Sequence, residues 1–339
     1  MIKDTIAKLA EKAALSEKQS EETMLQIMEG QATPAQIAAF LMGLRVKGET
    51  VEEIAGAVRA MRSKATRIRL GATKVVDTCG TGGDGAQTFN ISTTTAFVVA
   101  GAGLTVAKHG NRSVSSKSGS ADVLNALGVN IDLPAEKVAE CIDTVGVGFL
   151  FAPLYHSAMK HCAGPRQDMG VRTLLNILGP LSNPAGATLQ VVGVYEERLV
   201  ELLARVLVHL GTQHCFVVHG LDGLDEITVT GRTVVAEGKA GVVSRYVVEP
   251  KDFGIERASI KELVGGTAEQ NAQITREVLQ GRKGPRRDIV CVNAAPALVA
   301  GGLVKTLRDG FHLAGTIIDT GKAIAKLDQL VTYTKRAAA

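Results

Sequence analysis

The chain of 339 residues lacks the features that mark several classes of protein. It contains no run of about 18 apolar residues, the length that a membrane-spanning helix needs. Its 38 basic and 34 acidic residues leave a net charge of +4, which is too balanced to demand nucleic acid or an anionic membrane as a partner. Residues 1–15 are charged and amphipathic, unlike a secretory signal peptide. We therefore expect a cytoplasmic protein that binds neither nucleic acid nor a membrane.

Cysteine is also sparse, and its spacing argues against two kinds of structural site. The five cysteines are odd in number and scattered, so they fit neither a disulfide framework nor the paired C-x₂-C ligands of a structural zinc site. We expect reduced thiols throughout. Cys79 lies in a glycine-rich loop, where it is either a nucleophile or a small residue that fills space. The cysteines are Cys79, Cys141, Cys162, Cys215 and Cys291.

A glycine-rich segment, Gly80-Thr81-Gly82-Gly83-Asp84, follows the strand-like run 74–77, and a helix is predicted from about residue 93 to residue 100. This arrangement suits phosphate, because backbone N–H groups can approach the anion and the helix N-terminus adds partial positive charge. The segment is not a Walker loop, which needs a following lysine. It is not a Rossmann fingerprint either, because that helix begins directly after the glycines. The alternative is an ordinary turn between a strand and a helix.

Polar side chains near this segment refine the prediction. The carboxylate of Asp84 would repel a phosphate unless a metal ion or a sugar hydroxyl lay between them, which indicates a Mg²⁺-bound diphosphate or a ribose. The hydroxyls of Ser92 and Thr93 stand where the helix begins, so they either cap the helix or donate to a phosphate. The sequence therefore predicts a protein that handles a phosphorylated small molecule.

A second polar loop, residues 108–120, follows the predicted strand 104–107. It contains three cationic and five serine side chains. Ligands collect at the carboxyl ends of strands in open α/β sheets. We interpret the loop as a second phosphate-binding surface, and a solvated serine-rich loop is the alternative.

The order of predicted helices and strands indicates an α/β fold with a helical N-terminal part. Thr33-Pro34 marks one helix start, and Thr50 with Glu53 forms a capping box before another. From residue 75 onward, apolar strands alternate with helices, as in a largely parallel sheet that is covered on both faces. Pro296 predicts a kink or break in the helix that contains it. The other predicted strands are 147–151, 189–195, 215–219 and 226–230, and the later helices are 267–280 and 287–301.

Taken in order, these motifs resemble those of the anthranilate phosphoribosyltransferase family. The resemblance covers nearly the whole chain and implies the nucleoside phosphorylase-like phosphoribosyltransferase fold, in which a small N-terminal α-helical domain precedes a large α/β domain with a mainly parallel central sheet. It implies a small domain of residues 1–70 joined by 165–185, a large domain of 71–164 and 186–339, and a homodimer. The matching segments are residues 80–84, 90–93, 108–111, 119–124 and 172–184, followed by Asp225-Glu226.

The resemblance implies an enzyme of tryptophan biosynthesis. Such an enzyme transfers the phosphoribosyl group of 5-phosphoribosyl-1-pyrophosphate (PRPP) to the amine of anthranilate with Mg²⁺, and it releases N-(5-phosphoribosyl)anthranilate and pyrophosphate. Charge develops on the ribose and on the leaving group, so catalysis is mainly electrostatic and positional. No covalent step is needed, which favours Cys79 as a filling residue. Two alternatives stay open: a pyrimidine nucleoside phosphorylase of the same fold, which needs no metal pair, and a non-enzymatic relative that binds nucleic acid.

The resemblance also implies which residues bind Mg²⁺ and PRPP. The expected metal ligands are the oxygens of Asp225, Glu226 and Ser92, with substrate and water as further ligands. From the sequence alone, Asp225 and Glu226 could equally belong to an acidic turn before a strand. The expected PRPP-binding residues are Gly80, Gly83, Asp84, Thr88, Asn90, Ile91, Ser92, Thr93, Lys108, His109, Gly110, Asn111, Arg112, Ser113, Val114, Ser115, Ser116 and Ser120.

A separate set of residues is expected to bind anthranilate. Arg166 is the natural partner of its carboxylate, because a guanidinium can make two parallel hydrogen bonds to it. The alternative is that Arg166 pairs with Asp168 or caps a helix. His109 either accepts a proton late in the reaction or lines the pocket, since an unprotonated aromatic amine needs no strong base. The expected anthranilate-binding residues are Gly80, His109, Asn111, His156 and Arg166.

Overall fold

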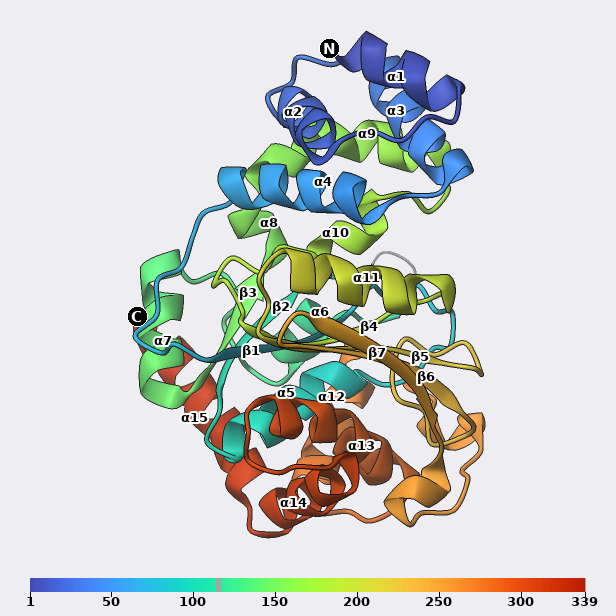
Figure 1. The fold of residues 1–339 in the computed structure, drawn as a ribbon. Helices are drawn as coiled ribbons and strands as arrows, with labels where there is room; N and C mark the ends of the chain where they lie inside the picture. The colour runs from blue at the N-terminus through green and yellow to red at the C-terminus, as the bar shows by residue number, and fades with distance from the viewer. Residues whose placement is uncertain (114–116, 339) are drawn as a thin grey trace.

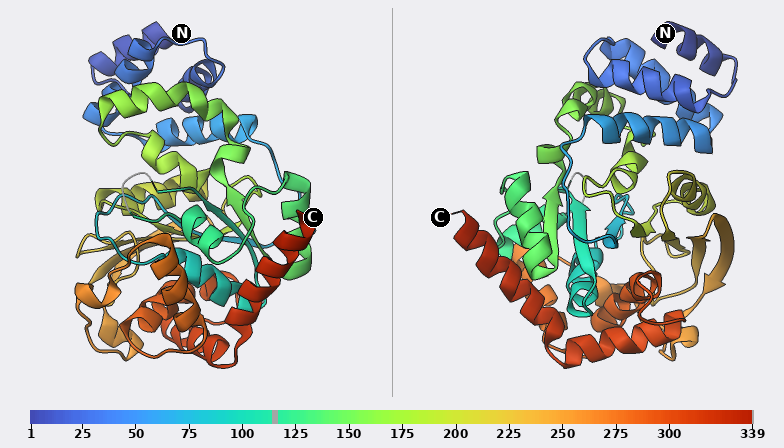
Figure 2. Two further views of the ribbon diagram at one scale, coloured as in Figure 1. Left: turned by 180° about the vertical axis from the view of Figure 1, so that it is seen from behind. Right: turned by 60° about the vertical axis from the view of Figure 1, so that its left-hand side comes forward.

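The computed structural model describes residues 1–113 and 117–338. Helices alone form one end of the molecule, and an α/β body forms the rest (Figure 1, Figure 2). The predicted fold class, a helical N-terminal part followed by an α/β part, is confirmed. In the ranges described, no helix is both long and apolar enough to cross a membrane.

Capping residues in the sequence start three helices at the helical end. The hydroxyls of Ser16, Thr33 and Thr50 each accept a hydrogen bond from the N–H three residues on, and the side chain of that residue bonds back to the cap. Two helices from much later in the chain, α9 and α10, pack against α2, α3 and α4 (Figure 1). The bounds are α1 Ile2–Ala10, α2 Glu17–Met28, α3 Pro34–Lys47, α4 Val51–Lys64, α9 Lys160–Met169 and α10 Leu175–Leu181.

Seven strands form one sheet in the order β3-β2-β1-β4-β5-β6-β7. The strands from β1 to β5 pair in parallel, and β6 and β7 add an antiparallel edge. The mainly parallel sheet that the sequence predicts is therefore confirmed. The bounds are β1 Val75–Gly80, β2 Thr105–Gly110, β3 Val147–Phe151, β4 Leu189–Gly193, β5 His214–Gly220, β6 Thr233–Lys239 and β7 Val242–Val248.

The predicted strand at 226–230 is wrong. This segment is an irregular loop between β5 and β6. Its apolar side chains Ile227 and Val229 are buried, which produced the strand-like pattern. Its backbone pairs with a side chain instead of a neighbouring strand, because Asn293 accepts from the Ile227 N–H at 2.8 Å and donates to the Ile227 carbonyl at 2.8 Å.

Helices cover both faces of the sheet. On the face toward the helical end lies α11, and on the opposite face lie α5, α12, α13 and α14 (Figure 1). The predicted break at Pro296 does not occur, because α13 is buried against α5 and α14 and continues to Ala300. The last helix, α15, packs against α5 and α7 and runs along one side of the body (Figure 2). The bounds are α5 Ile91–Gly101, α6 Ser120–Ala126, α7 Ala135–Val145, α8 Ala152–Tyr155, α11 Arg198–His209, α12 Ala268–Leu279, α13 Pro285–Ala300, α14 Leu307–Asp319 and α15 Lys322–Ala337, with 3-10 turns at Ser157–Met159, Pro250–Phe253 and Ile260–Leu263.

Candidate functional site

The glycine-rich loop and the acidic pair meet at the end of β1. The Gly82 N–H donates to Asp225 Oδ2 at 2.8 Å. A Cβ atom at Gly80 would lie 2.3 Å from Asp225 Oδ2, and one at Gly193 would lie 1.6 Å from the Asp225 carbonyl oxygen. Gly82 and Gly83 have φ angles of +66° and +76°, which favour glycine. Glycine at these positions therefore lets two segments far apart in sequence form one site.

Three carboxylates gather at this junction. Asp225 and Glu226 are half-buried, with protein atoms packed closely around them. Burial, with the nearby charge of Asp84, raises the pKa of Asp225 to about 7. Burial and the charge of Asp225 raise the pKa of Glu226 well above its ordinary value, and Lys108 opposes that shift. The carboxylates repel one another unless a cation lies among them.

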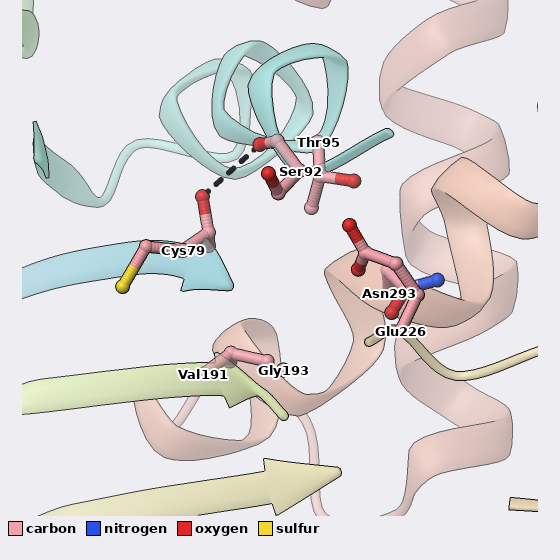
Figure 3. A pocket seen from close by; sticks show the side chains of 8 residues that line it. Cys79, Ser92, Thr95, Val191, Gly193, Glu226 and Asn293 are labelled. Carbon is pink, nitrogen blue, oxygen red and sulfur yellow. Dashed lines mark hydrogen bonds between the residues drawn. The ribbon is translucent and has the colours of Figure 1, made fainter. Parts of the chain in front are cut away.

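This junction fits a divalent cation that is held jointly with a substrate. Among the residues described, no group of three or more His, Cys, Asp and Glu side chains forms a metal site by itself. Figure 3 shows Glu226 and Ser92 on opposite sides of a small cavity that Thr95 and Asn293 also line. Two or three protein oxygens beside an open space suit Mg²⁺, which usually keeps water or substrate phosphate in its coordination shell.

Cys79 lines the same cavity, but its chemistry is that of a filling residue. Its sulfur points away from Ser92 and Glu226 (Figure 3). Burial and the charge of Asp77 raise the pKa of the Cys79 thiol well above its ordinary value. A thiol that resists ionisation is a poor nucleophile.

Lys108 brings a buried positive charge to the start of α5. Its side chain is 4% exposed. The ammonium group donates to the Thr78 carbonyl and lies 3.4 Å from Ser92 Oγ. The parallel pairing of β1 and β2 carries Lys108 to this position, since the two strands end at the same edge of the sheet.

At the start of α5, a ligand can reach backbone groups more easily than side chains. The side chains of Ile91 and Thr93 are buried, at 2% and 1% exposed, so these residues can reach a ligand only through their backbone. Thr88 forms an isolated antiparallel bridge with Val264, which holds the preceding loop in place. The structure therefore brings the expected PRPP-binding residues at 88–93 to one end of α5, as a phosphate cradle requires.

The serine-rich loop folds back onto the start of α6. Asp122 Oδ2 accepts from the N–H groups of Ser113 at 3.1 Å and Gly119 at 2.9 Å, and Asp122 Oδ1 pairs with Arg112 at 3.1 Å. The Ser120 hydroxyl donates to the Asn111 carbonyl at 3.1 Å. Gly110 is required here, because a Cβ atom would lie 2.2 Å from Ser120 Oγ. The expected residues Val114, Ser115 and Ser116 lie outside the residues that the structure describes.

Two buried histidines, one of them on β2, form a polar pair of adjacent rings. The rings of His109 and His156 are 5.1 Å apart, and their side chains are 4% and 5% exposed. Burial lowers the pKa of His109 to about 3 and that of His156 to about 4. His109 Nδ1 lies 3.1 Å from the Gly179 carbonyl oxygen, so Nδ1 carries the proton and Nε2 keeps a free lone pair. The buried Ser182 hydroxyl also lacks a hydrogen-bond partner among the described residues.

Arg166 lies in the last turn of α9, half-buried and unpaired. Within the described ranges it makes no ion pair and no side-chain hydrogen bond. The alternative in which Arg166 pairs with Asp168 is therefore not supported by the described residues. The alternative in which it stabilises a helix end stays open, because Arg166 is the basic residue in the last turn of α9. Asn111 is another residue that we expect to bind anthranilate. It is exposed, and its Oδ1 accepts a hydrogen bond from the Arg112 N–H at 2.7 Å.

Comparison with known proteins identifies the family. Residues 72–324 match the α/β domain of a glycosyl transferase family, and residues 3–65 match the helical bundle domain of such a family. Anthranilate phosphoribosyltransferase of Acetivibrio thermocellus is 55% identical and is aligned over 98% of this chain and 97% of its own length. The enzyme of Moorella thermoacetica is 54% identical over the full length of both chains. The chain belongs to the anthranilate phosphoribosyltransferase family.

Solved structures of this family superpose closely on the chain. The enzyme of Thermus thermophilus has a TM-score of 0.93 and 40% identity, over 98% of this chain and 99% of that one. A structure of anthranilate phosphoribosyltransferase from Saccharomyces cerevisiae, in complex with PRPP and Mg, has a TM-score of 0.89 and 27% identity, over 99% and 98% of the two chains. The protein is a pentosyltransferase of tryptophan biosynthesis that transfers the phosphoribosyl group to anthranilate. These relatives support neither the phosphorylase nor the nucleic-acid-binding alternative.

The structure adds two residues at the site that the sequence did not single out. Arg172 donates to the Gly83 carbonyl, and its guanidinium lies 4.2 Å from the centre of the Tyr195 ring. The buried Asp77 carboxylate accepts from the His109 N–H at 3.1 Å and from Asn183 Nδ2 at 2.8 Å. A charged residue within a buried strand was an available signal for Asp77. No local signal marked the contact of Arg172.

Proposed function

We propose that the transfer takes place where the glycine-rich loop, the start of α5, the serine-rich loop and the buried pair of His109 and His156 converge. The observation that supports this best is the meeting of Asp225 with the Gly80 to Gly83 segment at the end of β1, since it joins an anion-binding loop to a cation-binding pair. Lys108 and His109 lie on β2, the adjacent parallel strand, and His156 packs beside His109 from the end of α8. One edge of the sheet would thus present donor and acceptor to each other.

In this proposal, the donor end of the site binds PRPP. Backbone N–H groups at Gly83 and at the start of α5 face its phosphates, and Lys108 and Arg112 add positive charge. Asp225, Glu226 and Ser92 would hold Mg²⁺, which neutralises the diphosphate and stabilises it as the leaving group. The likeness to a yeast enzyme in complex with PRPP and Mg supports the assignment.

The acceptor end of the site binds anthranilate. The unpaired guanidinium of Arg166 would hold the carboxylate, with Asn111 and the backbone of Gly80 beside the ring. His109 and His156 are neutral at physiological pH, so they can line an uncharged aromatic ring without repelling the positive charge that develops on the ribose. With a pKa of about 3, His109 is a weak base, and its Nε2 serves to orient the amine by accepting an N–H.

The proposal also covers organisation and setting. We assign residues 1–70 and 165–185 to a small domain and 71–164 with 186–339 to a large one, a division supported by the packing of α9 against α2 and α3. We propose a homodimer on the family resemblance, and a cytoplasmic location without nucleic acid or membrane partners on the balanced charge and the charged N-terminal segment. Light scattering after gel filtration tests the dimer, because a monomeric mass at assay concentration would contradict it.

One assay tests the function and its alternative together. Pyrophosphate release from PRPP is measured with and without anthranilate, and with and without Mg²⁺. We expect release that depends on both anthranilate and Mg²⁺. Release without anthranilate would contradict the transfer reaction. Phosphorolysis of thymidine by inorganic phosphate, at a rate comparable to transfer, would support the nucleoside phosphorylase instead.

A further inference from the structure

We propose that Asn271, a buried residue of α12, is a positioning residue for PRPP binding. It holds the side chain of Asn90 away from the start of α5, and so leaves the N–H groups of that helix open to the substrate. Asn271 lies outside every motif of the sequence and is 181 residues from Asn90. The inference rests on the donor site proposed above.

The hydrogen bonds around Asn271 settle the orientation of both amides. Asn271 is 2% exposed, and its Oδ1 accepts from the Gly266 N–H at 2.8 Å. Its Nδ2 therefore points to Asn90 Oδ1, at 2.9 Å. Asn90 Nδ2 in turn donates to the Ser118 carbonyl at 3.1 Å. Since a backbone N–H only donates and a carbonyl only accepts, reversing either amide would lose a bond at each end.

This pairing diverts Asn90 from its usual role. Asparagine at an N-cap normally accepts a hydrogen bond from an N–H in the first turn of the helix, which occupies a group that an anion could use. Asn90 is the N-cap of α5, yet its side chain makes no such bond. Its Oδ1 instead accepts from Asn271 Nδ2 at 2.9 Å, with a longer contact of 3.5 Å from the Ser118 hydroxyl. In that turn the Ile91 N–H donates to the Phe89 carbonyl at 2.8 Å and the Ser92 N–H faces Glu226, so the group that a capping Asn90 would take from a phosphate is the Thr93 N–H.

The segment before α12 supports the same region of the donor site. The Gly265 N–H donates to the Gln87 carbonyl at 2.9 Å, and the Phe89 N–H donates to the Leu263 carbonyl at 3.1 Å. A Cβ atom at Gly265 would lie 2.7 Å from Phe89 Cα, so the two segments are in close contact. Asn271 is thus anchored to the same backbone that positions the loop leading into α5.

A second bond between the two helices supplies a matched control. Thr275, one turn along α12 from Asn271, lies 3.0 Å from Thr94 through their hydroxyls. Thr275 is as deeply buried as Asn271, but its side-chain hydrogen bond goes to Thr94 and not to the Asn90 side chain. Asn271→Ala and Thr275→Val should therefore both lower the melting temperature, and only the former should affect PRPP binding.

The test measures KM for both substrates in these two variants. We expect Asn271→Ala to raise KM for PRPP by roughly threefold to tenfold, the size of one hydrogen bond gained by a competing cap, with KM for anthranilate within about twofold of the parent. Thr275→Val should leave both KM values within about twofold. An unchanged KM for PRPP in Asn271→Ala, or an equal rise in Thr275→Val, would overturn the proposal. Should Asn271→Ala not fold, Asn271→Asp decides, because it keeps the acceptor for Gly266 and removes the donor for Asn90.

A double-variant cycle separates this proposal from the proposed donor site. If Asn271 acts by restraining Asn90, adding Asn271→Ala to Asn90→Ala should cause no further rise in KM for PRPP. Additive effects would overturn the restraint. Asn90→Ala alone should leave KM for PRPP within about twofold of the parent, because it removes the side chain that would compete for the first turn of α5. A rise in Asn90→Ala as large as that in Asn271→Ala would overturn the restraint, since the Asn90 side chain would then bind PRPP itself. If Gly83→Val also left KM for PRPP unchanged, the proposed donor site would fail, whereas a rise in Gly83→Val without one in Asn271→Ala would remove only the role of Asn271.

Discussion

Replacing Arg166 by alanine tests the acceptor site most directly. The Arg166 guanidinium has no ion pair or side-chain hydrogen bond with the residues that the structure describes, so its removal breaks no polar contact among them. Its proposed bonds to the anthranilate carboxylate are charged hydrogen bonds, which contribute on the order of 1.5–3 kcal/mol. Arg166→Ala should accordingly lower kcat/KM for anthranilate by roughly 10- to 150-fold, since about 1.4 kcal/mol corresponds to tenfold.

The assay is steady-state pyrophosphate release with each substrate varied in turn. KM for PRPP should change little, because Arg166 lies in α9 and not in the loops that hold the donor. Lys160→Ala provides the control, since it removes an exposed cation from the first turn of the same helix. Arg166→Lys should fall between parent and alanine variant, because an ammonium keeps the charge but cannot form two parallel bonds.

Aniline decides whether Arg166 recognises the carboxylate. It has the amine of anthranilate and no carboxylate, so the parent and Arg166→Ala should use it about equally poorly. If the variant lost the same factor with aniline as with anthranilate, Arg166 would act on the structure of the site and the acceptor would bind elsewhere.

Three further perturbations test other parts of the site. The double variant Asp225→Asn with Glu226→Gln should lower Mg²⁺-dependent turnover by about 100-fold or more while the melting temperature stays within a few degrees, and full activity would exclude the metal assignment. Gly83→Val should lower the affinity for PRPP, measured by calorimetry, about tenfold. The reason is that the φ of +76° at this position costs a β-branched residue on the order of 1–3 kcal/mol. An equal loss of affinity for anthranilate would contradict this assignment. In the folded protein the pKa values of His109 and His156 are about 3 and about 4, below the ordinary value of 6.5. Between 6.5 and these lowered values the unfolded chain binds more protons than the folded protein does. The free energy of unfolding should therefore fall as the pH decreases from 6.5. Urea unfolding at pH 7 and pH 5 measures this, and His156→Gln should reduce the difference.

Local signals were sufficient for the elements that carry the site. The N-cap and proline at Thr33-Pro34 and the capping box at Thr50 predict helix starts that the structure confirms, because a cap bonds to an N–H only three residues away. The glycine-rich loop before α5 and the strand 147–151 were likewise predictable, since turn glycine and buried strand residues leave a pattern within a few positions. The family resemblance then led to the activity, through motifs that keep their order along the chain.

Long-range contacts decided the elements that local sequence patterns predicted wrongly or missed. Buried Ile227 and Val229 suggested a strand, but the bonds of Asn293 hold that segment as a loop and aim Asp225 at the glycine-rich segment. The antiparallel strands β6 and β7 were missed, and the proline in α13 was expected to break a helix that packing keeps intact.

The chain by itself determined the local conformations and the chemical groups of this enzyme, while the tertiary structure decided which groups meet. Caps, turns and strand patterns are set by neighbours a few residues apart, so they are visible in the sequence. The approach of Asp225 to Gly80, the bond from Asn183 to Asp77 and the restraint of Asn90 by Asn271 join residues more than 100 positions apart. No local pattern encodes such pairs, because they exist only once the sheet has brought its strand ends to one edge.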